Sequence, residues 1–415
     1  MKEVIVIGGG VVGLFSAYYL AQEGCKITIL DQNDFSDGCS YGNAGMIVPS
    51  HIIPLAAPGM IQQGIKWMFD VKSPFYIEPR INLELIKWGY SFYKSATKSK
   101  VEKAMPALKE LSVFSKSLYQ DLAKDEDDFL YKEKGLLMLY KTASVAEEEI
   151  EAAEKAQALG LEVDFLNKSE VLTLEKGLST DVLGGIHYKS DAHLNPNKLM
   201  DFLKRKLKEM GVVFVSNEEV IDFELENNTI KKVQTHCNQY SADEVILATG
   251  AWSPRLSKKI GWSLSLLPGK GYSFTIPDLK NKPEIPSILC EAKVAVTPIG
   301  EAVRFGGTME ITHVKNTTIN TNRVKGITEA ISKYYPDCSI PFLNKESIWY
   351  GYRPCSPDGL PYIGRLSKVR NILLATGHAM MGLSLAPATG KLITETILNQ
   401  KTSVSLNLFN PERKF

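Results

Sequence analysis

Cysteine is scarce in this chain, and the cysteines it has are widely separated. The 415 residues contain six, with no CxxC pair, at Cys25, Cys39, Cys237, Cys290, Cys338 and Cys355. Zinc sites, iron–sulfur clusters and disulfide-rich scaffolds need cysteines at close, regular spacings. The sequence therefore predicts neither a metal centre nor a disulfide framework, and it favours a reducing compartment such as the cytoplasm.

An excess of charge is also missing. Lys and Arg total 48 against 47 Asp and Glu, so the formal net charge is +1, and no basic block is present. A nucleic-acid partner is therefore not expected. Residues 4–21 carry no charge and resemble a membrane span in length, but glycines interrupt them and Asp31 completes a nucleotide-binding unit. We interpret this stretch as folded and retained.

The first 31 residues carry a nucleotide-binding pattern. A β-branched run over residues 4–7 predicts a buried strand, and Gly8, Gly10 and Gly13 follow at GxGxxG spacing. Gly8 would permit a tight turn, Gly10 the close approach of a pyrophosphate, and Gly13 the packing of a helix on the strand. A second strand leads to Asp31, whose carboxylate would accept the hydroxyls of a ribose. The pattern predicts a dinucleotide site without choosing between FAD and NAD.

Two later stretches have unusual compositions. Small and polar residues fill positions 36–45, which indicates either backbone lying against a ligand or an ordinary surface loop. Positions 52–100 mix lysines with aromatic residues, a pattern that suits a membrane surface, a lid over a substrate pocket, or a core edged by solvated lysines. The aromatic residues there are Trp67, Phe69, Phe75, Tyr76, Trp88, Tyr90, Phe92 and Tyr93.

The rest of the chain alternates between two kinds of pattern. Strand–helix alternation near residues 195–215, a buried strand within 242–250, and a strand and helix over 372–398 match the opening unit. Between residues 264 and 307, short β-type runs alternate with Pro and Gly, which is typical of an antiparallel sheet. We therefore expect an α/β protein with two discontinuous domains and the active site between them.

The expected domain boundaries follow from these patterns. A Rossmann-like nucleotide-binding domain would comprise residues 1–50, 191–255 and 345–415. A substrate-binding domain, built on an antiparallel or mixed β-sheet with helices, would comprise residues 51–190 and 256–344.

Three motifs, in the order found here, resemble the FAD-dependent amine and amino-acid oxidoreductases related to glycine oxidase and D-amino-acid oxidase. After the opening glycines come Ala248-Thr249-Gly250-Ala251-Trp252-Ser253 and a long pattern from Gly351 to Gly364, followed by Thr376-Gly377-His378. The resemblance covers essentially the whole chain. Gly42-Asn43-Ala44-Gly45 and Lys270-Gly271-Tyr272-Ser273 make the bacterial D-amino-acid dehydrogenase branch the nearest match within it.

This resemblance implies FAD rather than NAD. Gly8, Gly10 and Gly13 would hold the ADP half with Asp31 and Gln32, and Val220 would meet the adenine through its backbone. The N-terminus of the last helix would point at the carbonyl edge of the flavin, which gains negative charge on reduction. The residues expected along the flavin and its ribityl chain are Ser40, Asn43, Ala44, Gly45, Met46, Thr249, Gly250, Trp252, Gly377, His378, Met381, Gly382, Leu383 and Ser384.

The resemblance also bears on how the flavin is held. Some related enzymes attach it covalently through a histidine just ahead of an Ala-Ala-Gly, where this chain has Gly42. Others use a cysteine before the Pro-Asp motif, and Cys355 does not lie in that register. Non-covalent FAD is therefore expected.

Arg353 is the residue expected to hold the substrate, because a guanidinium binds a carboxylate through two parallel hydrogen bonds. The alternative is a surface or interdomain ion pair. Tyr272 would add a hydroxyl to the same carboxylate, unless it is a core aromatic of the sheet. Met46 and His51 are further expected pocket residues, although His51 also fits a plain loop histidine. His378 would pack against the flavin or donate a hydrogen bond to it, with proton transfer as its alternative role.

The expected reaction is oxidative deamination of a D-amino acid, or of a cyclic D-imino acid such as D-proline or D-hydroxyproline. Hydride would pass from Cα to flavin N5, and the imino acid would hydrolyse to a 2-oxo acid and ammonia. The resemblance implies a quinone as electron acceptor, and with it peripheral contact at the inner face of the cell membrane. Three alternatives stay open: an O₂-using glycine- or sarcosine-type oxidase, a flavin hydroxylase, and a non-catalytic FAD electron-transfer subunit. The hydroxylase is disfavoured because Thr376-Gly377-His378 stands where those enzymes carry a Gly-Asp pair.

Overall fold

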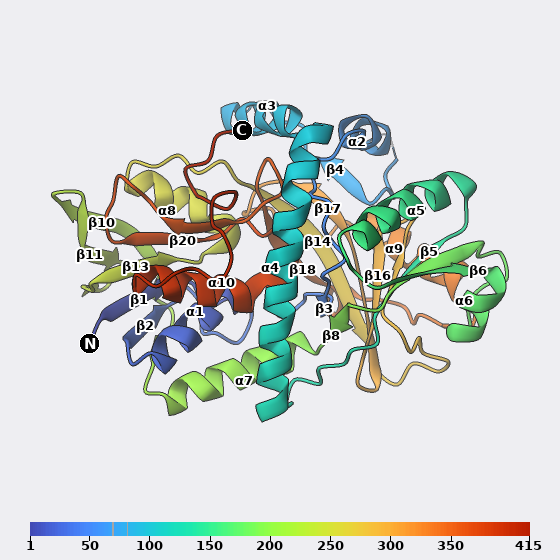
Figure 1. Ribbon diagram of the computed structural model, residues 1–415, viewed down its shortest axis with the longest axis horizontal. Helices are drawn as coiled ribbons and strands as arrows, with labels where there is room; N and C mark the ends of the chain where they lie inside the picture. Colours follow the sequence, from blue (N-terminus) through green and yellow to red (C-terminus); the bar gives the residue numbers. More distant parts are fainter. Residues whose placement is uncertain (69, 81) are drawn as a thin grey trace.

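The computed structural model describes residues 1–68, 70–80 and 82–415, and its strands form two main sheets on opposite sides of the molecule (Figure 1). The first runs in the order β19-β20-β13-β1-β2-β9, and β1 pairs in parallel with both of its neighbours. Its strands are β1 (Glu3–Ile7), β2 (Lys26–Leu30), β9 (Val213–Val215), β13 (Glu244–Leu247), β19 (Tyr362–Arg365) and β20 (Ile372–Thr376).

This sheet is covered on both faces, which explains why β1 is apolar at consecutive positions. Val4 and Val6 face a cluster that includes α1 and α10, whereas Ile5 and Ile7 face α8 and a small antiparallel sheet. The helices on the first face are α1 (Val11–Gln22), α7 (Pro196–Glu209) and α10 (Gly382–Ile397). On the second face lie α8 (Ser253–Lys259), β10 (Val220–Glu226), β11 (Thr229–Thr235) and β12 (Gln239–Tyr240).

The second sheet is mixed and runs in the order β18-β14-β17-β16-β15-β5-β7-β6, with β4 added beside β17. Helix α9 (Thr321–Tyr334) packs Ile327 and Ile331 into the core of this half. Its strands are β4 (Phe75–Ile77), β5 (Leu136–Tyr140), β6 (Val163–Asn167), β7 (Gly184–Tyr188), β14 (Leu267–Ile276), β15 (Ser287–Leu289), β16 (Val294–Ile299), β17 (Ala302–Ile311) and β18 (Trp349–Cys355), and its other helices are α5 (Ala143–Ala158) and α6 (Lys168–Leu174). The expected fold class, α/β with a Rossmann-like sheet and a second mixed sheet, is confirmed.

We propose that the domain division follows the two sheets, with one change from the boundaries expected from sequence. Strand β18 lies within residues 345–415, which we expected in the nucleotide-binding domain. It pairs with β14 over its whole length, from Trp349 opposite Ser273 to Cys355 opposite Leu267. The segment that carries Arg353 therefore belongs to the second sheet, and the chain crosses back to the first sheet only at β19.

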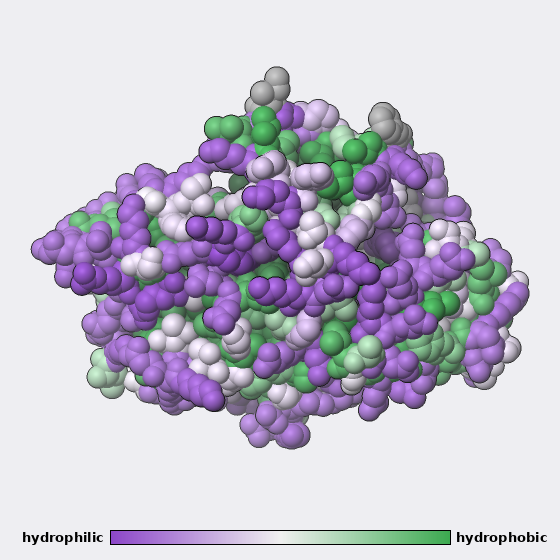
Figure 2. All heavy atoms as spheres, turned by 45° about the horizontal axis from the view of Figure 1, so that its top comes forward, coloured by the Kyte–Doolittle hydropathy of each residue, from purple (hydrophilic) through white to green (hydrophobic). Residues whose placement is uncertain are grey.

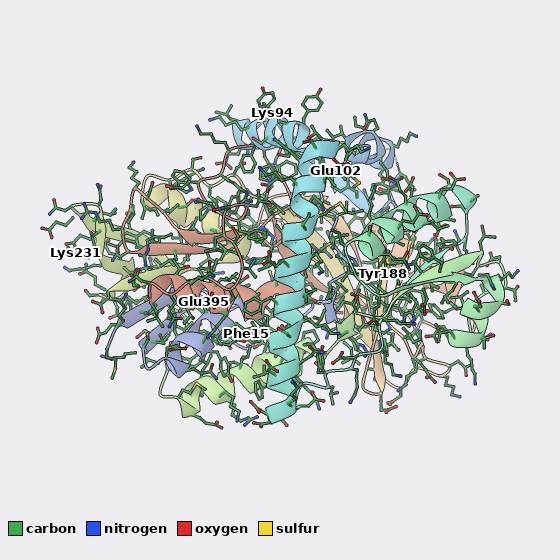
Figure 3. The ribbon with its side chains drawn as sticks, in the orientation of Figure 1. Phe15, Lys94, Glu102, Tyr188, Lys231 and Glu395 are labelled. Atoms are coloured by element: carbon green, nitrogen blue, oxygen red, sulfur yellow. The ribbon has the colours of Figure 1, made fainter. Side chains whose placement is uncertain are left out.

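Helix α4 (Lys98–Asp125) crosses in front of α10, near the middle of the molecule (Figure 1). The Tyr119 hydroxyl donates to Leu383 O at 2.8 Å, and Ser115 Oγ accepts from Ala388 N at 3.3 Å. Phe15 of α1 lies in the same cluster, 5.5 Å from Tyr119 between ring centroids. In Figure 3, Phe15 lies where these helices meet. This packing fixes the start of α10, which borders the site described below.

The aromatic and lysine-rich stretch forms α2 (Met60–Met68) and α3 (Leu83–Ser95), and these helices divide their apolar residues between two faces. Trp88 is buried, its indole N–H donates to Cys355 O, and Phe92 stacks on it. Tyr90 and Tyr93 face solvent and are 63% and 67% exposed. Phe69, part of the same composition, lies outside the described residues. In Figure 2, hydrophobic residues along the upper edge mark this end of the molecule.

Candidate active site

A single cavity of about 1070 Å³ receives residues from both sheets and from both ends of the chain. Its volume exceeds the ~300–1,000 Å³ of pockets that hold drug-sized ligands, so it suits a dinucleotide with a small substrate beside it. Gly8 and Asp31 line it from the first sheet, and Arg353 lines it from the second. The expected approach of the two chain ends is thereby observed.

The glycine turn has the geometry that the sequence pattern predicts. Gly8 has φ +106°, and a Cβ there would lie 2.7 Å from Ala248 O. A Cβ on Gly13 would lie 2.0 Å from Gly8 O, so only glycine lets α1 pack this closely on β1. A Cβ on Gly10 would meet nothing closer than Ser40 Oγ at 3.5 Å, which leaves its backbone open to the cavity. The turn and the start of α1 therefore form an open cradle that fits a pyrophosphate.

Asp31 is held in place at the tip of β2. One carboxylate oxygen accepts from Gly9 N at 2.7 Å, and the other accepts from Asn33 N at 2.9 Å. Burial raises the pKa of Asp31 above its usual value, although the two amides act in the opposite direction. Val220 begins β10 at the same end of the cavity, and its carbonyl accepts from the Arg255 guanidinium at 3.3 Å. This end of the cavity therefore offers a fixed carboxylate and a polypeptide edge to an adenosine.

The loop of small residues is fastened to the second sheet. Arg304 Nη1 donates to Tyr41 O at 2.7 Å and to Asn43 O at 2.8 Å, while Ser273 Oγ donates to Gly42 O at 2.8 Å. A Cβ on Gly42 would lie 1.9 Å from the Trp349 ring, so the backbone lies flat against that indole. The ligand-facing role predicted for this loop agrees with its position, because Ser40, Asn43 and Ala44 line the cavity.

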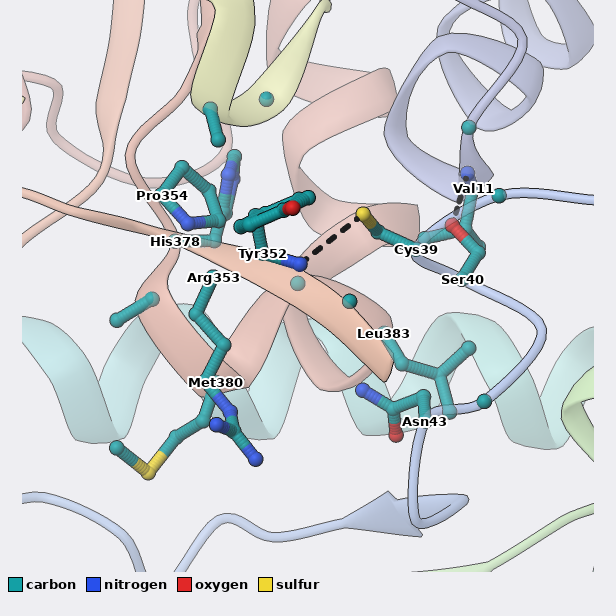
Figure 4. A pocket seen from close by; sticks show the side chains of 18 of the residues that line it. Val11, Cys39, Ser40, Asn43, Tyr352, Arg353, Pro354, His378, Met380 and Leu383 are labelled. Carbon is teal, nitrogen blue, oxygen red and sulfur yellow. Dashed lines mark hydrogen bonds between the residues drawn. The ribbon is translucent and has the colours of Figure 1, made fainter. Parts of the chain in front are cut away.

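Arg353 extends from β18 across the backbone of β14. A Cβ on Gly271 would lie 1.9 Å from Arg353 Nη1, which shows how closely the guanidinium covers that glycine. Nη1 donates to Thr308 O at 2.6 Å. Within the part of the chain that the structure describes, the guanidinium forms no ion pair with a carboxylate. Burial lowers the pKa of Arg353, but a guanidinium stays charged at any physiological pH. The cavity therefore contains an uncompensated cation with free donors (Figure 4).

Tyr272 borders the same cavity, but its hydroxyl does not reach Arg353, contrary to the expectation from sequence. In the pairing of β14 with β18, Arg353 lies opposite Gly269 and Tyr272 lies opposite Tyr350. Arg353 and Tyr272 are therefore three positions apart along the strand pair. Because side chains alternate along a strand, positions three apart face opposite sides of the sheet. The Tyr272 hydroxyl accepts from Asn320 N at 3.1 Å and donates to Glu310 Oε2 at 3.3 Å. It belongs to a buried network behind the sheet.

His378 is buried beside the start of α10, and its ring is neutral. Thr389 Oγ1 donates to Leu385 O, so it must accept from His378 Nε2–H at 2.9 Å. Burial lowers the pKa of His378 to about 3. A base this weak, with a threonine hydroxyl and not a carboxylate route bonded to its ring, is poorly matched to taking a proton near neutral pH. The N-terminal residues Gly382 and Leu383 of α10 face the cavity next to His378, so the positive end of the helix dipole is directed into it.

The two cysteines nearest this site are neutral thiols. Cys39 lines the cavity and its Sγ accepts from Tyr352 N at 3.3 Å (Figure 4). Burial raises the pKa of Cys39 to about 11 and that of Cys355 to about 12. Because the thiolate is the reactive form of cysteine, neither side chain is activated as a nucleophile.

Most residues singled out from the sequence meet at this cavity. Gly13, Gly45, Gly377 and Ser384 do not line it but support those that do; Ser384 Oγ, for example, accepts from Val48 N at 3.0 Å. The residues that line it are Gly8, Gly10, Asp31, Gln32, Ser40, Asn43, Ala44, Met46, His51, Val220, Thr249, Gly250, Trp252, Tyr272, Arg353, His378, Met381, Gly382 and Leu383.

Several lining residues were not anticipated. Trp349 lies four residues before Arg353 and so on the same face of β18, which is a signal that could have revealed it, whereas Tyr352 directly precedes Arg353 and alternation along the strand gives no such signal. Lys293 and Glu148 also line the cavity, and no sequence motif surrounds either residue.

Comparisons with known proteins agree with this geometry. The family model of the DAO family, described as FAD dependent oxidoreductase, matches residues 3–396. The D-amino acid dehydrogenase of Helicobacter pylori is 33% identical over 395 residues, which cover 94% of each chain. That of Vibrio atlanticus is 29% identical over 413 residues and 97% of each chain.

Solved structures show the same fold. Glycine oxidase from Geobacillus kaustophilus has a TM-score of 0.78 at 22% identity and covers 100% of both chains. L-proline dehydrogenase from P. horikoshii has a TM-score of 0.78 at 20% identity and covers 99% of this chain and 97% of its own. With the family model matched over nearly its whole length, this chain belongs to the DAO family of FAD-dependent oxidoreductases.

Proposed function

We propose that this enzyme oxidatively deaminates a D-amino acid, or a cyclic D-imino acid such as D-proline or D-hydroxyproline, to a 2-oxo acid. The observation that carries the proposal is the Arg353 guanidinium, which is partly buried where it lines the cavity and has Thr308 O as its hydrogen-bond acceptor among the described residues. A charge held partly out of water without a charged partner is costly, so the site is prepared for an anionic ligand. The preference for D-substrates is suggested by the names of the similar dehydrogenases.

The residues around Arg353 suggest how the chain assists the reaction. Bound FAD supplies the acceptor for the hydride that leaves the substrate Cα. Arg353 would fix the carboxylate through two donors, which sets both the position and the orientation of Cα. Gly382 and Leu383, at the positive end of α10, would stabilise negative charge that develops near them. Trp349 and Tyr352 would limit the access of water to the reacting atoms.

The test is anaerobic mixing of the FAD-loaded protein with D- and L-amino acids, D-proline analogues and glycine derivatives, followed by the flavin absorbance. Bleaching by D-amino acids, with little by their L-enantiomers, is the expected result. Preferential bleaching by glycine or sarcosine, with rapid reoxidation in air, would favour the amine-oxidase alternative. No bleaching by any compound would favour an electron-transfer subunit and would refute the proposal.

We further propose that the FAD is held without a covalent bond. Cys39 and Cys355 are protonated thiols, and glycine stands at the position where related enzymes use histidine. Acid precipitation of the yellow protein is therefore expected to leave all of the flavin absorbance in the supernatant. Colour that remains with the pellet would contradict the proposal.

We also propose that electrons pass to a membrane quinone and that α3 rests on an anionic lipid surface. Leu83, Ile86, Tyr90 and Tyr93 are 61–67% exposed and recur at helical spacing, so they form one outward stripe. Lys87 directly follows Ile86 in the sequence and Lys94 directly follows Tyr93, so both lysines lie beside the stripe. Lys94 points outward in Figure 3. The neighbouring helix α2 borders the cavity with Met60, Gln63 and Trp67. Within the described residues, the structure contains no helix with the length and apolarity needed to cross a bilayer.

The double variant Ile86→Asp/Tyr90→Asp is expected to lower partitioning onto anionic vesicles by at least about tenfold, because each lost apolar contact is worth ~1.5–3 kcal/mol. Co-sedimentation with vesicles measures the effect. Phe165→Asp provides the control, since Phe165 is 41% exposed on β6 in the other half of the molecule. Equal partitioning of the double variant and the wild type would contradict the proposed surface.

A further inference from the structure

A buried carboxylate connects to the cavity through two neighbouring side chains. Asp191 is 0% exposed, and its two oxygens accept from Ser50 N at 3.0 Å and from Ser50 Oγ at 2.5 Å. Ser50 Oγ in turn lies 3.2 Å from His51 Nδ1. His51 lines the cavity that Arg353 also lines. An unbroken hydrogen-bonded chain therefore leads from the cavity to a carboxylate that is shielded from solvent.

The hydrogen-bond directions fix the resting state of this chain. With Asp191 ionised, the Ser50 hydroxyl donates its only proton to the carboxylate. The Ser50 oxygen must then accept from His51 Nδ1–H, which leaves Nε2 of the ring unprotonated. Nε2 has no partner among residues 1–68, 70–80 and 82–415, so its lone pair is available to a group in the cavity.

We propose that Asp191, Ser50 and His51 form a proton relay that removes the ammonium proton of the bound amino acid. This inference rests on the proposed function, because it supplies what that reaction needs. A free amino acid carries an ammonium group at neutral pH, and hydride can leave Cα only when the nitrogen lone pair is free to stabilise the developing iminium. A base that faces the cavity therefore gives the proton of the bound ammonium an acceptor that it can reach without bulk water.

The relay conserves protons at each step. His51 Nε2 takes one proton from the substrate ammonium, Nδ1–H passes its proton to Ser50 Oγ, and the Ser50 hydroxyl proton moves to Asp191. The products are a neutral substrate amine, a His51 ring protonated at Nε2 only, and a protonated Asp191. Because the steps are reversible, the proton returns to the cavity by the same route once the product has left.

The balance of pKa values agrees with storage of the proton on Asp191. Burial raises the pKa of Asp191 to about 7, against the opposing effect of its bonds from Ser50, whereas burial lowers the pKa of His51 to about 4. The proton is thus more stable on the carboxylate than on the ring. Other titratable or charged groups also act on this pair. Lys293 lies near His51, and it forms an ion pair with Glu149 and lies close to Glu148. Lys116, which pairs with Glu133, and Tyr188 lie near Asp191.

The variants Asp191→Asn and Ser50→Ala test the relay through the pH dependence of flavin reduction. For the wild type, we expect the rate under limiting D-amino acid to rise up to about pH 7, where Asp191 ionises, and then to level off. Without the relay, only the neutral-amine fraction reacts, and this fraction grows tenfold per pH unit. The variants should therefore show no plateau above pH 7, and their rate should keep rising with pH into the alkaline range. Ser50→Thr, which keeps the hydroxyl, should restore the plateau.

A second readout does not depend on turnover. Infrared spectra of the oxidised holoenzyme should contain a protonated-carboxyl band that titrates near pH 7 and is lost in Asp191→Asn. Glu175→Gln is the matched control: burial also raises the pKa of Glu175 to about 7, but backbone amides of Glu284 and Ile285 hold it, and it does not line the cavity. Glu175→Gln should remove its own band and leave the pH profile of flavin reduction unchanged.

The outcomes separate the relay from the proposed function. If D-amino acids bleach the wild-type flavin but the Asp191 and Ser50 variants give profiles parallel to the wild type, the relay is wrong and the triad only fastens the turn after β3 (Met46–Ile47) to β8 (Ala192–His193). If no D-amino acid bleaches the wild type at any pH, the proposed function fails, and the relay fails with it.

Discussion

Arg353→Ala is expected to raise the dissociation constant of the best D-amino acid by about 10²- to 10³-fold while FAD stays bound. Removal of one partner from a buried, hydrogen-bonded charge pair costs ~2–5 kcal/mol. The Arg353 side chain donates to Thr308 O in the second sheet, whereas the glycine turn and Asp31 that would hold the nucleotide belong to the first. Anaerobic titration of the flavin spectrum gives the dissociation constant and the FAD content together.

Two further variants separate the charge of Arg353 from its geometry. Arg353→Lys keeps a cation but loses the planar pair of donors, so its effect should be intermediate. Gly271→Ala keeps the arginine but places a Cβ 1.9 Å from Nη1, which forces the guanidinium to move. Its substrate affinity should also fall, with the FAD content unchanged. An unchanged dissociation constant in Arg353→Ala would remove this residue from substrate binding.

The nucleotide end of the site was predictable because its pattern is local. Gly8, Gly10, Gly13 and Asp31 are fixed by two strands, one turn and one helix, and each spacing has a direct steric or hydrogen-bonding cause. Long specific motifs likewise predicted that Arg353 faces the cavity. These features depend on neighbours within a few dozen residues, or on a pattern too long to arise by chance.

The substrate end was less predictable because it depends on strand register. Whether Tyr272 faces Arg353 or the opposite side is decided by the pairing of β14 with β18, and a shift of one residue would reverse the answer. The link between Ser50 and Asp191 joins residues 141 positions apart. Composition and spacing contain no signal for either arrangement. The same reason explains why the expected domain boundary at residue 345 could not anticipate the pairing of β18 with β14.

The aromatic and lysine-rich stretch was partly predictable. Its composition was compatible with a membrane surface, a lid or a core edged by lysines, and it did not distinguish the buried Trp88 from the exposed Tyr90. That distinction requires knowing which residues share a face of α3. Once the segment is known to be a helix, the spacing of Leu83, Ile86, Tyr90 and Tyr93 places them on one face. Composition therefore identified the segment, and only the fold identified its outward face.

The cavity depends on how closely α10 approaches α1, and Gly390→Ala is expected to disrupt that approach. A Cβ at Gly390 would lie 2.6 Å from Phe15 C, 2.7 Å from Phe15 O and 2.8 Å from Ser16 N. These are backbone atoms of a packed helix, so no side-chain rotation can relieve the contact. Both helices begin at the cavity, α1 with Val11 and α10 with Gly382, and their separation would therefore loosen both ends of the FAD site.

The expected loss for Gly390→Ala is about 1–3 kcal/mol of stability from overpacking, set against a gain of up to ~1 kcal/mol in helix propensity. The apparent melting temperature and the temperature of flavin release, followed by fluorescence, should therefore both fall. Gly89→Ala provides the matched control, because Gly89 is also within a helix, α3, but a Cβ there meets nothing within 4 Å. The same substitution should raise the melting temperature at Gly89, since only the propensity gain applies. If both variants shifted it in the same direction, steric contact between α1 and α10 would not be what limits their approach.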